Sequence, residues 1–255
     1  MKDPIWEGVY ADFDAAPGST SVFAEELWVE RSRAKARDMI AAIRPRGAAP
    51  AAVAAQGYAL PLVASLVQAG QGGVRVLDFG GSVGFAFPLL VGALGDPDRF
   101  HVAVVDNPRI CAAGREVFAG EPRITFSEDL PSGGTFDIVH CGSSLQYVRD
   151  TEALLARLAA VTPRYLVLDD LPAGNVQTFV STQNYYGKKI PHWFFSLPEL
   201  VARVSRATGF RLIHQERYVG TYLGVSGPMP LGNLPADRRI EHALNLVFER
   251  PHGSA

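Results

Sequence analysis

The chain has 255 residues, of which 47% are hydrophobic and 20% charged, so it holds ample apolar material for a folded core. Its formal net charge of −2 leaves no electrostatic footprint for nucleic acid, and we expect no such partner. The most apolar long stretch, residues 48–70, is interrupted by prolines, glutamines and a glycine, whereas a membrane span needs about 20 nearly unbroken apolar residues. We therefore expect no membrane partner.

The two cysteines, Cys111 and Cys141, lie in strongly patterned sequence and are predicted to be reduced core thiols. The N-terminus carries no basic and then apolar signal-peptide pattern. Both features favour a cytoplasmic protein. No grouping of histidines, cysteines and carboxylates has zinc spacing, so no metal site is predicted.

Residues 1–72 are predicted to form an N-terminal arm followed by helices. The arm, residues 1–20, mixes aromatic residues with Asp, Gly and Pro. Apolar positions recur at helical spacing over 21–43, and a second helix is expected to begin near Pro50 and run to Gln68. We expect this part to cover the pocket of the following domain or to form a homodimer contact.

Residues 73–250 alternate between strand and helix signals, which is typical of a parallel sheet in a doubly wound α/β fold. Strands are predicted at 74–79, 100–105, 123–127, 136–141, 164–169, 210–218 and 241–248, and helices at 83–94, 108–118, 151–161 and 196–208. One of the last two strands is expected to be antiparallel. The tail, residues 251–255, is expected to be loose.

A glycine-rich turn follows the first of these strands, in the segment 76–84. The turn contains Gly80, Gly81, Ser82 and Gly84. Positive φ angles and close approach of the backbone to a ligand are cheap only for glycine. A glycine-rich match alone is weak evidence, but here it follows a strand and opens a helix.

An acid, Asp106, ends the next strand, and Asn107 follows it. A carboxylate at this place can accept hydrogen bonds from both ribose hydroxyls of an adenosine group. The competing interpretation is that Asp106 only caps the helix that begins at Pro108.

Asp78 precedes the glycines where a dinucleotide site would have its first glycine. S-adenosylmethionine (SAM) carries an ammonium and a sulfonium and no phosphate. A carboxylate beside the turn suits these cations and repels a pyrophosphate, so the sequence favours SAM over NAD.

Two further segments extend the predicted cofactor site. Glu128 or Asp129, after the third strand, would accept from the adenine amino group, although an ordinary solvated loop fits them equally well. Gly142 and Ser143, after the fourth strand, would let the backbone approach the methionine part of SAM.

These motifs resemble a bacterial family of class I SAM-dependent methyltransferase-like proteins found around polysaccharide and natural-product gene clusters. The matching segments are 6–10, 77–84, 104–108, 142–148, 182–186 and 190–195. The resemblance implies a Rossmann-like fold with a mainly parallel seven-stranded sheet and an N-terminal helical extension. It also implies a SAM pocket at the glycine turn and at the acid ending the second strand. The chain has Asp106 where the family pattern has Glu, which keeps the ribose role.

The insertion 172–195 is too long for a simple connection, and such loops usually act as lids. Its catalytic candidates are His192, Tyr185, Tyr186 and Gln183. The tyrosines would contact the sulfonium through cation–π interactions, and Gln183 would orient a substrate. The competing interpretation is a hydrophobic lid with satisfied polar groups.

His192 is the first candidate for a catalytic base, because the pKa of a histidine lies near neutrality. Tyr147, with its neighbour Gln146, and Asp170 are the alternatives.

Three functions are compatible with these residues. The first is methyl transfer from SAM to a small-molecule acceptor in biosynthetic metabolism. In the second, the α-amine of SAM attacks its own Cγ, which gives azetidine-2-carboxylate and methylthioadenosine. The third is a SAM-binding protein without catalysis, which the complete motif set disfavours.

Overall fold

The computed structural model describes residues 4–43, 59–161, 164–185 and 187–251. Its centre is a seven-stranded sheet in the order β10-β13-β6-β5-β2-β3-β4. The strands are β2 (Val74–Phe79), β3 (Phe100–Val105), β4 (Ile124–Ser127), β5 (Ile138–Gly142), β6 (Tyr165–Leu171), β10 (Arg211–Tyr218) and β13 (Ala243–Glu249). β13 runs antiparallel to both of its neighbours, and the pairs from β6 to β4 are parallel. The predicted mainly parallel seven-stranded sheet is confirmed.

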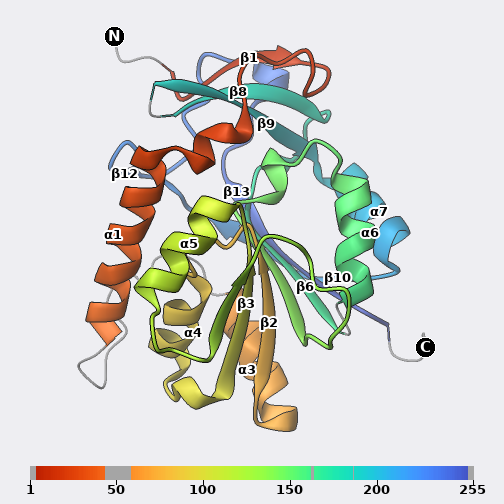
Figure 1. Cartoon of the computed structure of the whole chain (residues 1–255). Helices are drawn as coiled ribbons and strands as arrows, with labels where there is room; N and C mark the ends of the chain where they lie inside the picture. Colours follow the sequence, from red (N-terminus) through yellow and green to blue (C-terminus); the bar gives the residue numbers. More distant parts are fainter. Residues whose placement is uncertain (1–3, 44–58, 162–163, 186, 252–255) are drawn as a thin grey trace.

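Helices cover both faces of this sheet (Figure 1). They are α1 (Glu26–Ile43), α3 (Ala59–Gln71), α4 (Ala86–Leu94), α5 (Pro108–Val117), α6 (Thr151–Val161) and α7 (Leu197–Thr208). α7 ends where predicted, because Gly209 takes the left-handed conformation at φ 73°. The helix expected from residue 83 begins only at Ala86, since Gly84 is held at φ 92°. The predicted helix start near Pro50 lies outside the described residues.

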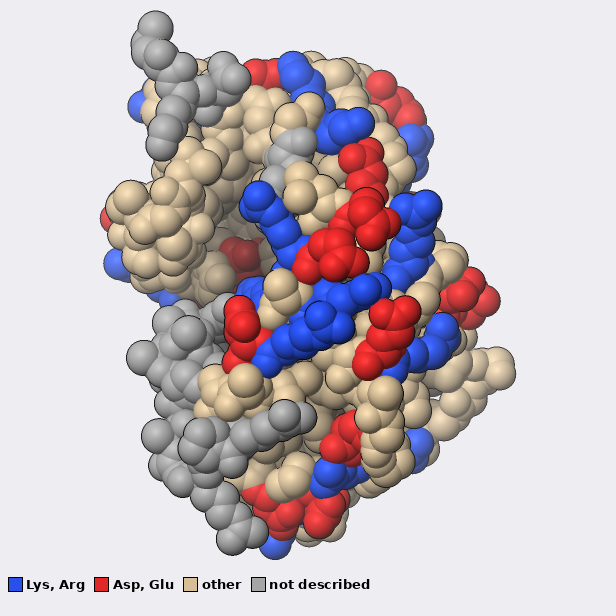
Figure 2. All heavy atoms as spheres, turned by 60° about the vertical axis from the view of Figure 1, so that its left-hand side comes forward, with Lys and Arg blue, Asp and Glu red and all other residues tan. Residues whose placement is uncertain are grey.

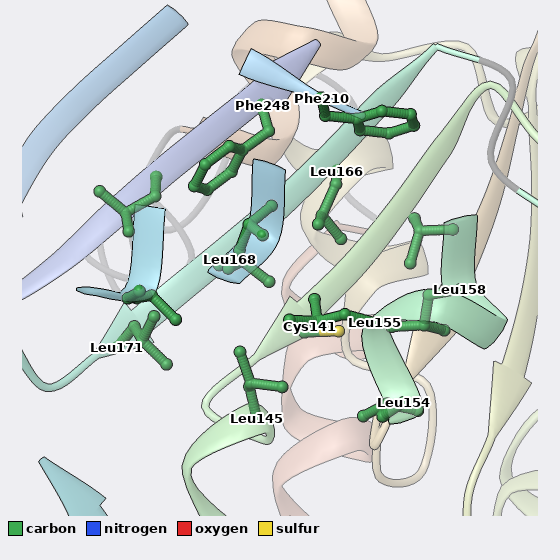
Figure 3. Packing of buried hydrophobic residues seen from close by; sticks show 14 of the residues in the cluster. Cys141, Leu145, Leu154, Leu155, Leu158, Leu166, Leu168, Leu171, Phe210 and Phe248 are labelled. Atoms are coloured by element: carbon green, nitrogen blue, oxygen red, sulfur yellow. The ribbon is translucent and has the colours of Figure 1, made fainter. Parts of the chain in front are cut away.

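The core has one layer on each side of the sheet. β6 shows why, because its alternate residues enter opposite layers. Leu166 and Leu168 pack against α6 and α7, whereas Tyr165 and Val167 join the layer beneath α3 and α4. Figure 3 shows Leu166 and Leu168 in the first layer, facing leucines of α6. Full burial of such a side chain contributes about 1.5–3 kcal/mol, so the two layers hold the strand ends in fixed positions.

A second, four-stranded sheet in the order β1-β8-β9-β7 lies beyond the carboxyl ends of the parallel strands (Figure 1). It consists of β1 (Trp6–Tyr10), β7 (Ala173–Gly174), β8 (Phe179–Tyr185) and β9 (Lys188–Ser196), and we call it the cap sheet. The segment 172–195 is therefore largely an ordered β-hairpin rather than the long loop expected from sequence. β1 completes it through pairs such as Trp6 with Gln183, so the N-terminal arm is a strand of the cap.

Short elements complete the description. A two-stranded hairpin joins β11 (Thr221–Tyr222) to β12 (Val225–Ser226), and single 3-10 turns occur at Thr20–Ala24, Pro97–Arg99, Leu145–Tyr147 and Ala236–Arg238. Among the described residues, no helix combines the length and the apolar character that crossing a membrane requires.

Candidate functional site

The glycine turn between β2 and α4 is held in strained conformations. Gly80, Ser82 and Gly84 have φ angles of 66°, 53° and 92°. A Cβ on Gly80 would lie 2.5 Å from the Cβ of Ser144, and one on Gly81 would lie 2.1 Å from Oδ2 of Asp78. Side chains at Gly80 and Gly81 are therefore excluded by neighbouring atoms, and there the backbone forms the surface of the turn.

Asp106, at the end of β3, is bonded directly to this turn. Its Oδ2 accepts a hydrogen bond from the backbone N–H of Ser82 at 2.9 Å. Its Oδ1 accepts from the backbone and the side chain of Asn107 at 2.7 and 2.9 Å. Asn107, not Asp106, caps α5, because its side chain accepts from the N–H of Ile110. A carboxylate can accept about four hydrogen bonds, so Asp106 keeps capacity for a ligand hydroxyl.

Asp78 lies beneath the turn and is only 1% exposed. Its Oδ1 lies 2.7 Å from Nδ1 of His140 on β5, and Nε2 of His140 lies 3.2 Å from Oδ2 of Asp169 on β6. Burial alone would lower the pKa of His140, but the two carboxylates outweigh it and raise that pKa to about 10. The three side chains form a buried cluster, Asp78–His140–Asp169, with the histidine cationic.

The carboxyl ends of β5 and β6 carry two further residues in the left-handed region, Ser143 at φ 53° and Asp170 at φ 51°. The Ser143 hydroxyl donates to Oδ2 of Asp170 at 2.8 Å. Burial, with a smaller effect of Asp169, raises the pKa of Asp170 to about 7, although the bond from Ser143 opposes this rise. The Asp170 side chain remains half-buried and Ser143 exposed, so this carboxylate lies deep yet accessible.

Gln146 and Tyr147 link this edge to the cap sheet. Nε2 of Gln146 donates to the carbonyl of Asp170 at 3.1 Å and to the hydroxyl of Ser143 at 3.2 Å. The Tyr147 hydroxyl donates to Oε1 of Gln183 on β8 at 2.7 Å. The structure thus brings together the predicted residues Gln146, Tyr147 and Gln183.

His192 lies on β9 and is only 3% exposed. Its ring contacts those of Trp6, Tyr147 and Phe194, with centroids 5.7, 5.1 and 5.0 Å away. Burial lowers its pKa to about 3, so the imidazole is neutral and a weak proton acceptor. Its Nδ1 has no hydrogen-bond partner in the described part of the chain.

The other predicted residues are more peripheral. Tyr185 packs its ring on Trp28 of α1 at 5.5 Å, and Tyr186 lies outside the described residues. Glu128 and Asp129 are exposed after β4, and the N–H of Asp129 is bonded to the hydroxyl of Ser127. A Cβ on Gly142 would lie 2.6 Å from the His140 ring, so that glycine makes room for the buried cluster.

Sequence reasoning did not identify His140, Asp169 or Trp6. The strand pattern around His140 gives no sign of a charge, and only the pairing of this histidine with carboxylates of two neighbouring strands reveals it. The strand ending AspAsp at 169–170 was a usable signal, because acids at the carboxyl ends of parallel strands meet at one edge. Figure 2 shows a hollow beneath the cap sheet with acidic atoms visible inside it.

The strand order, the glycine turn and its bonded acid define the chain as a Rossmann-like protein of the methyltransferase class. A family model described as a methyltransferase domain matches residues 30–215, and the chain belongs to this family. No match was found among curated proteins.

The solved structures that match this chain share little sequence identity with it. The complex between the Trm112 methyltransferase activator and a methyltransferase of Haloferax volcanii matches at 14% identity and TM-score 0.55, covering 92% of this chain and 99% of that chain. The magnesium protoporphyrin IX methyltransferase of Synechocystis PCC 6803, solved with SAM, matches at 19% identity and TM-score 0.49, covering 74% and 76%. The 1,6-didemethyltoxoflavin-N1-methyltransferase of Burkholderia thailandensis, solved with its substrate and S-adenosylhomocysteine (SAH), matches at 16% identity and TM-score 0.49, covering 87% and 89%.

Proposed function

We propose that the protein is a SAM-dependent methyltransferase that acts on a small molecule. The observation that carries this proposal is the bond from the Ser82 N–H to Asp106, because it joins the glycine turn to an acid with spare acceptor capacity. Membership of the methyltransferase-domain family supports the same reaction.

The residues present fit SAM. Asp106 would accept from the ribose hydroxyls, and the backbone of Gly80, Ser82 and Gly142 would line the amino-acid part. Glu128 or Asp129, exposed after β4, would accept from the adenine amine. An acidic residue, Asp78, beneath the turn suits a cationic ligand better than a pyrophosphate. SAM supplies a carbon activated for attack by its bond to a sulfonium.

The protein contributes positioning and a proton acceptor, as expected for a displacement at an already activated carbon. Tyr147 and Gln183, bonded to each other beneath the cap sheet, would orient the acceptor. Tyr185, at the edge of the cap, would help to close it over the site. Asp170 is a better base than His192, because its pKa lies near 7 whereas that of His192 is about 3.

Isothermal titration calorimetry with SAM, SAH and NAD tests this proposal. We expect SAM and SAH to bind and to raise the melting temperature, since ligands of the native state stabilise it. Binding of NAD as tight as that of SAM would overturn the assignment.

The acceptor that we propose is an intermediate of bacterial natural-product or glycan biosynthesis. The charge of −2 offers no attraction to nucleic acid, in keeping with a small acceptor. We also propose that the protein forms a homodimer, which sedimentation of the pure protein tests.

The cyclising reaction is the alternative at the same site, because an amine of SAM itself would replace the acceptor. Asp170 would take the proton of that amine. Incubation with SAM alone separates the two reactions: methylthioadenosine identifies the cyclase, whereas formation of SAH only after an acceptor is added identifies the methyltransferase.

A further inference from the structure

Asp170 is held in place at every polar backbone atom despite its positive φ. Its N–H donates to Oδ1 of Asn245 on β13 at 2.9 Å, and its carbonyl accepts from Gln146. Its neighbour Ser143 is in the same left-handed region, which is unusual for residues other than glycine. Such strain is unfavourable and persists where the surroundings impose it, often at functional sites.

Three tyrosines from different elements lie near this carboxylate. Tyr147, Tyr218 and Tyr222 have raised pKa values, first because of burial and next because the negative charge of Asp170 lies close to each hydroxyl. Tyr147 and Tyr222 also belong to the ring cluster around His192 and Trp6. The carboxylate therefore lies beside this aromatic cluster.

We propose that Asp170 is the catalytic residue that accepts the proton of an amine nucleophile, and that the compound attacking the activated carbon is an amine. The proposal rests on the proposed function and names its substrate class. The amine is either that of a separate acceptor or the α-amine of SAM, and the chemistry at Asp170 is the same for both.

The match between proton donor and acceptor favours an amine over a hydroxyl. Asp170 has a pKa near 7, and an α-amine has one of about 8, so the transfer is almost balanced. The pKa of water, the simplest hydroxyl compound, is about 15.7, far above that of this carboxylate. Tyrosine rings also stabilise an ammonium by cation–π interaction before it loses its proton.

The step balances in atoms and charge. The ammonium gives one proton to Asp170, and the nitrogen lone pair then forms a bond to the carbon attached to the sulfonium. The carbon–sulfur bond breaks and its electron pair stays on sulfur, which becomes neutral. Asp170 returns its proton to water once the product has left.

Other titratable groups face Asp170 from each neighbouring element. Asp169 precedes it on β6 and is bonded to the cationic His140. Glu216 of β10 is bonded to Asn245, whose other side-chain atom contacts the backbone of Asp170. The tyrosines stay neutral below pH 10 because their pKa values are raised, so Asp170 is the group expected to titrate near pH 7.

The first experiment compares SAH with sinefungin, an analogue that carries an ammonium in place of the reacting sulfonium methyl. We expect the wild-type protein to bind sinefungin more tightly than SAH, and this preference to rise about tenfold from pH 6 to pH 8 as Asp170 ionises. In Asp170→Asn the preference should fall at least tenfold and become independent of pH, with SAH affinity within twofold of wild type. Asp38→Asn, which removes an exposed carboxylate on α1, is the matched control.

A preference for sinefungin that is the same in Asp170→Asn and in wild type overturns the role of Asp170. If wild type binds neither ligand, the proposed SAM site itself fails, and this result is distinct from the first. Ser143→Gly gives a second variant, because glycine tolerates the φ of 53°. Loss of the hydrogen bond from the Ser143 hydroxyl should raise the pKa of Asp170. The pH midpoint at which the protein comes to prefer sinefungin over SAH should then shift upward.

The second experiment tests the amine class with benzylamine and benzyl alcohol, titrated into the SAH complex and followed by NMR. Benzylamine should bind at least tenfold more tightly than the alcohol to wild type, and the difference should vanish in Asp170→Asn. An amine that binds no more tightly than the alcohol overturns the assignment of the substrate class. Formation of methylthioadenosine from SAM alone identifies SAM as the source of the amine.

Discussion

The central sheet and the cap sheet each bury one histidine, and they hold it in opposite charge states. His140 on β5 lies between two carboxylates and its pKa is raised to about 10. His192 on β9 lies among aromatic rings and its pKa is lowered to about 3. The same side chain is thus a fixed cation beneath the glycine turn and a neutral ring beneath the cap.

The difference shows that the two sides of the site, the carboxyl edge of the central sheet and the cap sheet, provide different chemical environments. The carboxyl edge of the central sheet carries charge, which suits a cationic ligand, whereas the buried histidine of the cap sheet lies among aromatic rings. Asp170 lies where these two parts of the site meet, and burial there raises its pKa to about 7.

The largest effect is expected from His140→Gln. Removing the cation leaves two buried carboxylates unpaired, and such losses cost about 3–5 kcal/mol of unfolding free energy. In wild type, His140 is protonated in both the folded and the unfolded state below pH 6.5. Its contribution to the free energy of unfolding is therefore complete there and is lost as the pH rises toward 10. Urea unfolding at pH 6.5, 8 and 9.5 measures the stability lost in the variant and the pH dependence of stability in wild type. The exposed His101→Gln is the control, and equal stability of His140→Gln and wild type at pH 6.5 would contradict this account.

Asp106→Ala comes next and acts on binding. Loss of a hydrogen bond to a charged group should weaken SAM binding by about 1.5–3 kcal/mol. Asn107→Ala is the matched comparison, because it removes the cap of α5 and should lower stability by about 0.5–2 kcal/mol with a smaller effect on SAM. Calorimetry and thermal melting separate the two. Unchanged SAM affinity in Asp106→Ala, with a lower melting temperature, would reduce Asp106 to a structural residue.

His192→Phe tests whether the histidine of the cap sheet is buried and neutral. The folded state keeps His192 neutral down to about pH 3 while the unfolded state takes up a proton near pH 6.5, so wild type loses stability as pH falls between these values. One proton corresponds to about 1.4 kcal/mol per pH unit, and the variant should lack this slope. Acid unfolding curves that stay parallel in wild type and variant would exclude a neutral buried His192.

The smallest expected effect is that of Tyr147→Phe. It removes the bond to Gln183 and keeps the ring, so the rate of SAM consumption should fall about three- to tenfold at unchanged SAM affinity, as for one hydrogen bond. Tyr10→Phe, on β1 of the cap sheet, is the control. A loss of SAM affinity in Tyr147→Phe equal to the loss in rate would place Tyr147 at the cofactor instead of the acceptor.

Much of the proposed cofactor site, meaning the glycine turn and Asp106, was predictable, because its sequence signals are local. Gly80, Gly84 and Asp106 stand in loops directly after strands with clear apolar patterns, and parallel strands bring their carboxyl ends to one edge. The strand positions and the helix end at Gly209 follow from the same short-range rules, whereas the pairing of β13 decided which of the last two strands is antiparallel.

The part of the site formed by the cap sheet and Asp170 was decided by tertiary structure. Pairing of Trp6 with Gln183 turned a predicted arm and a predicted loop into one sheet, and no local pattern encodes a contact between such distant segments. The ordinary pKa of histidine pointed to His192 as a base, yet a pKa depends on burial and on neighbouring charges. By itself the sequence determined the fold, the glycine turn and its acid. Only the packing of β5, β6 and the cap sheet decided that His140 is charged, that His192 is neutral and that Asp170 has a pKa near neutrality, because these properties arise from charges and enclosure contributed by residues far apart in the chain.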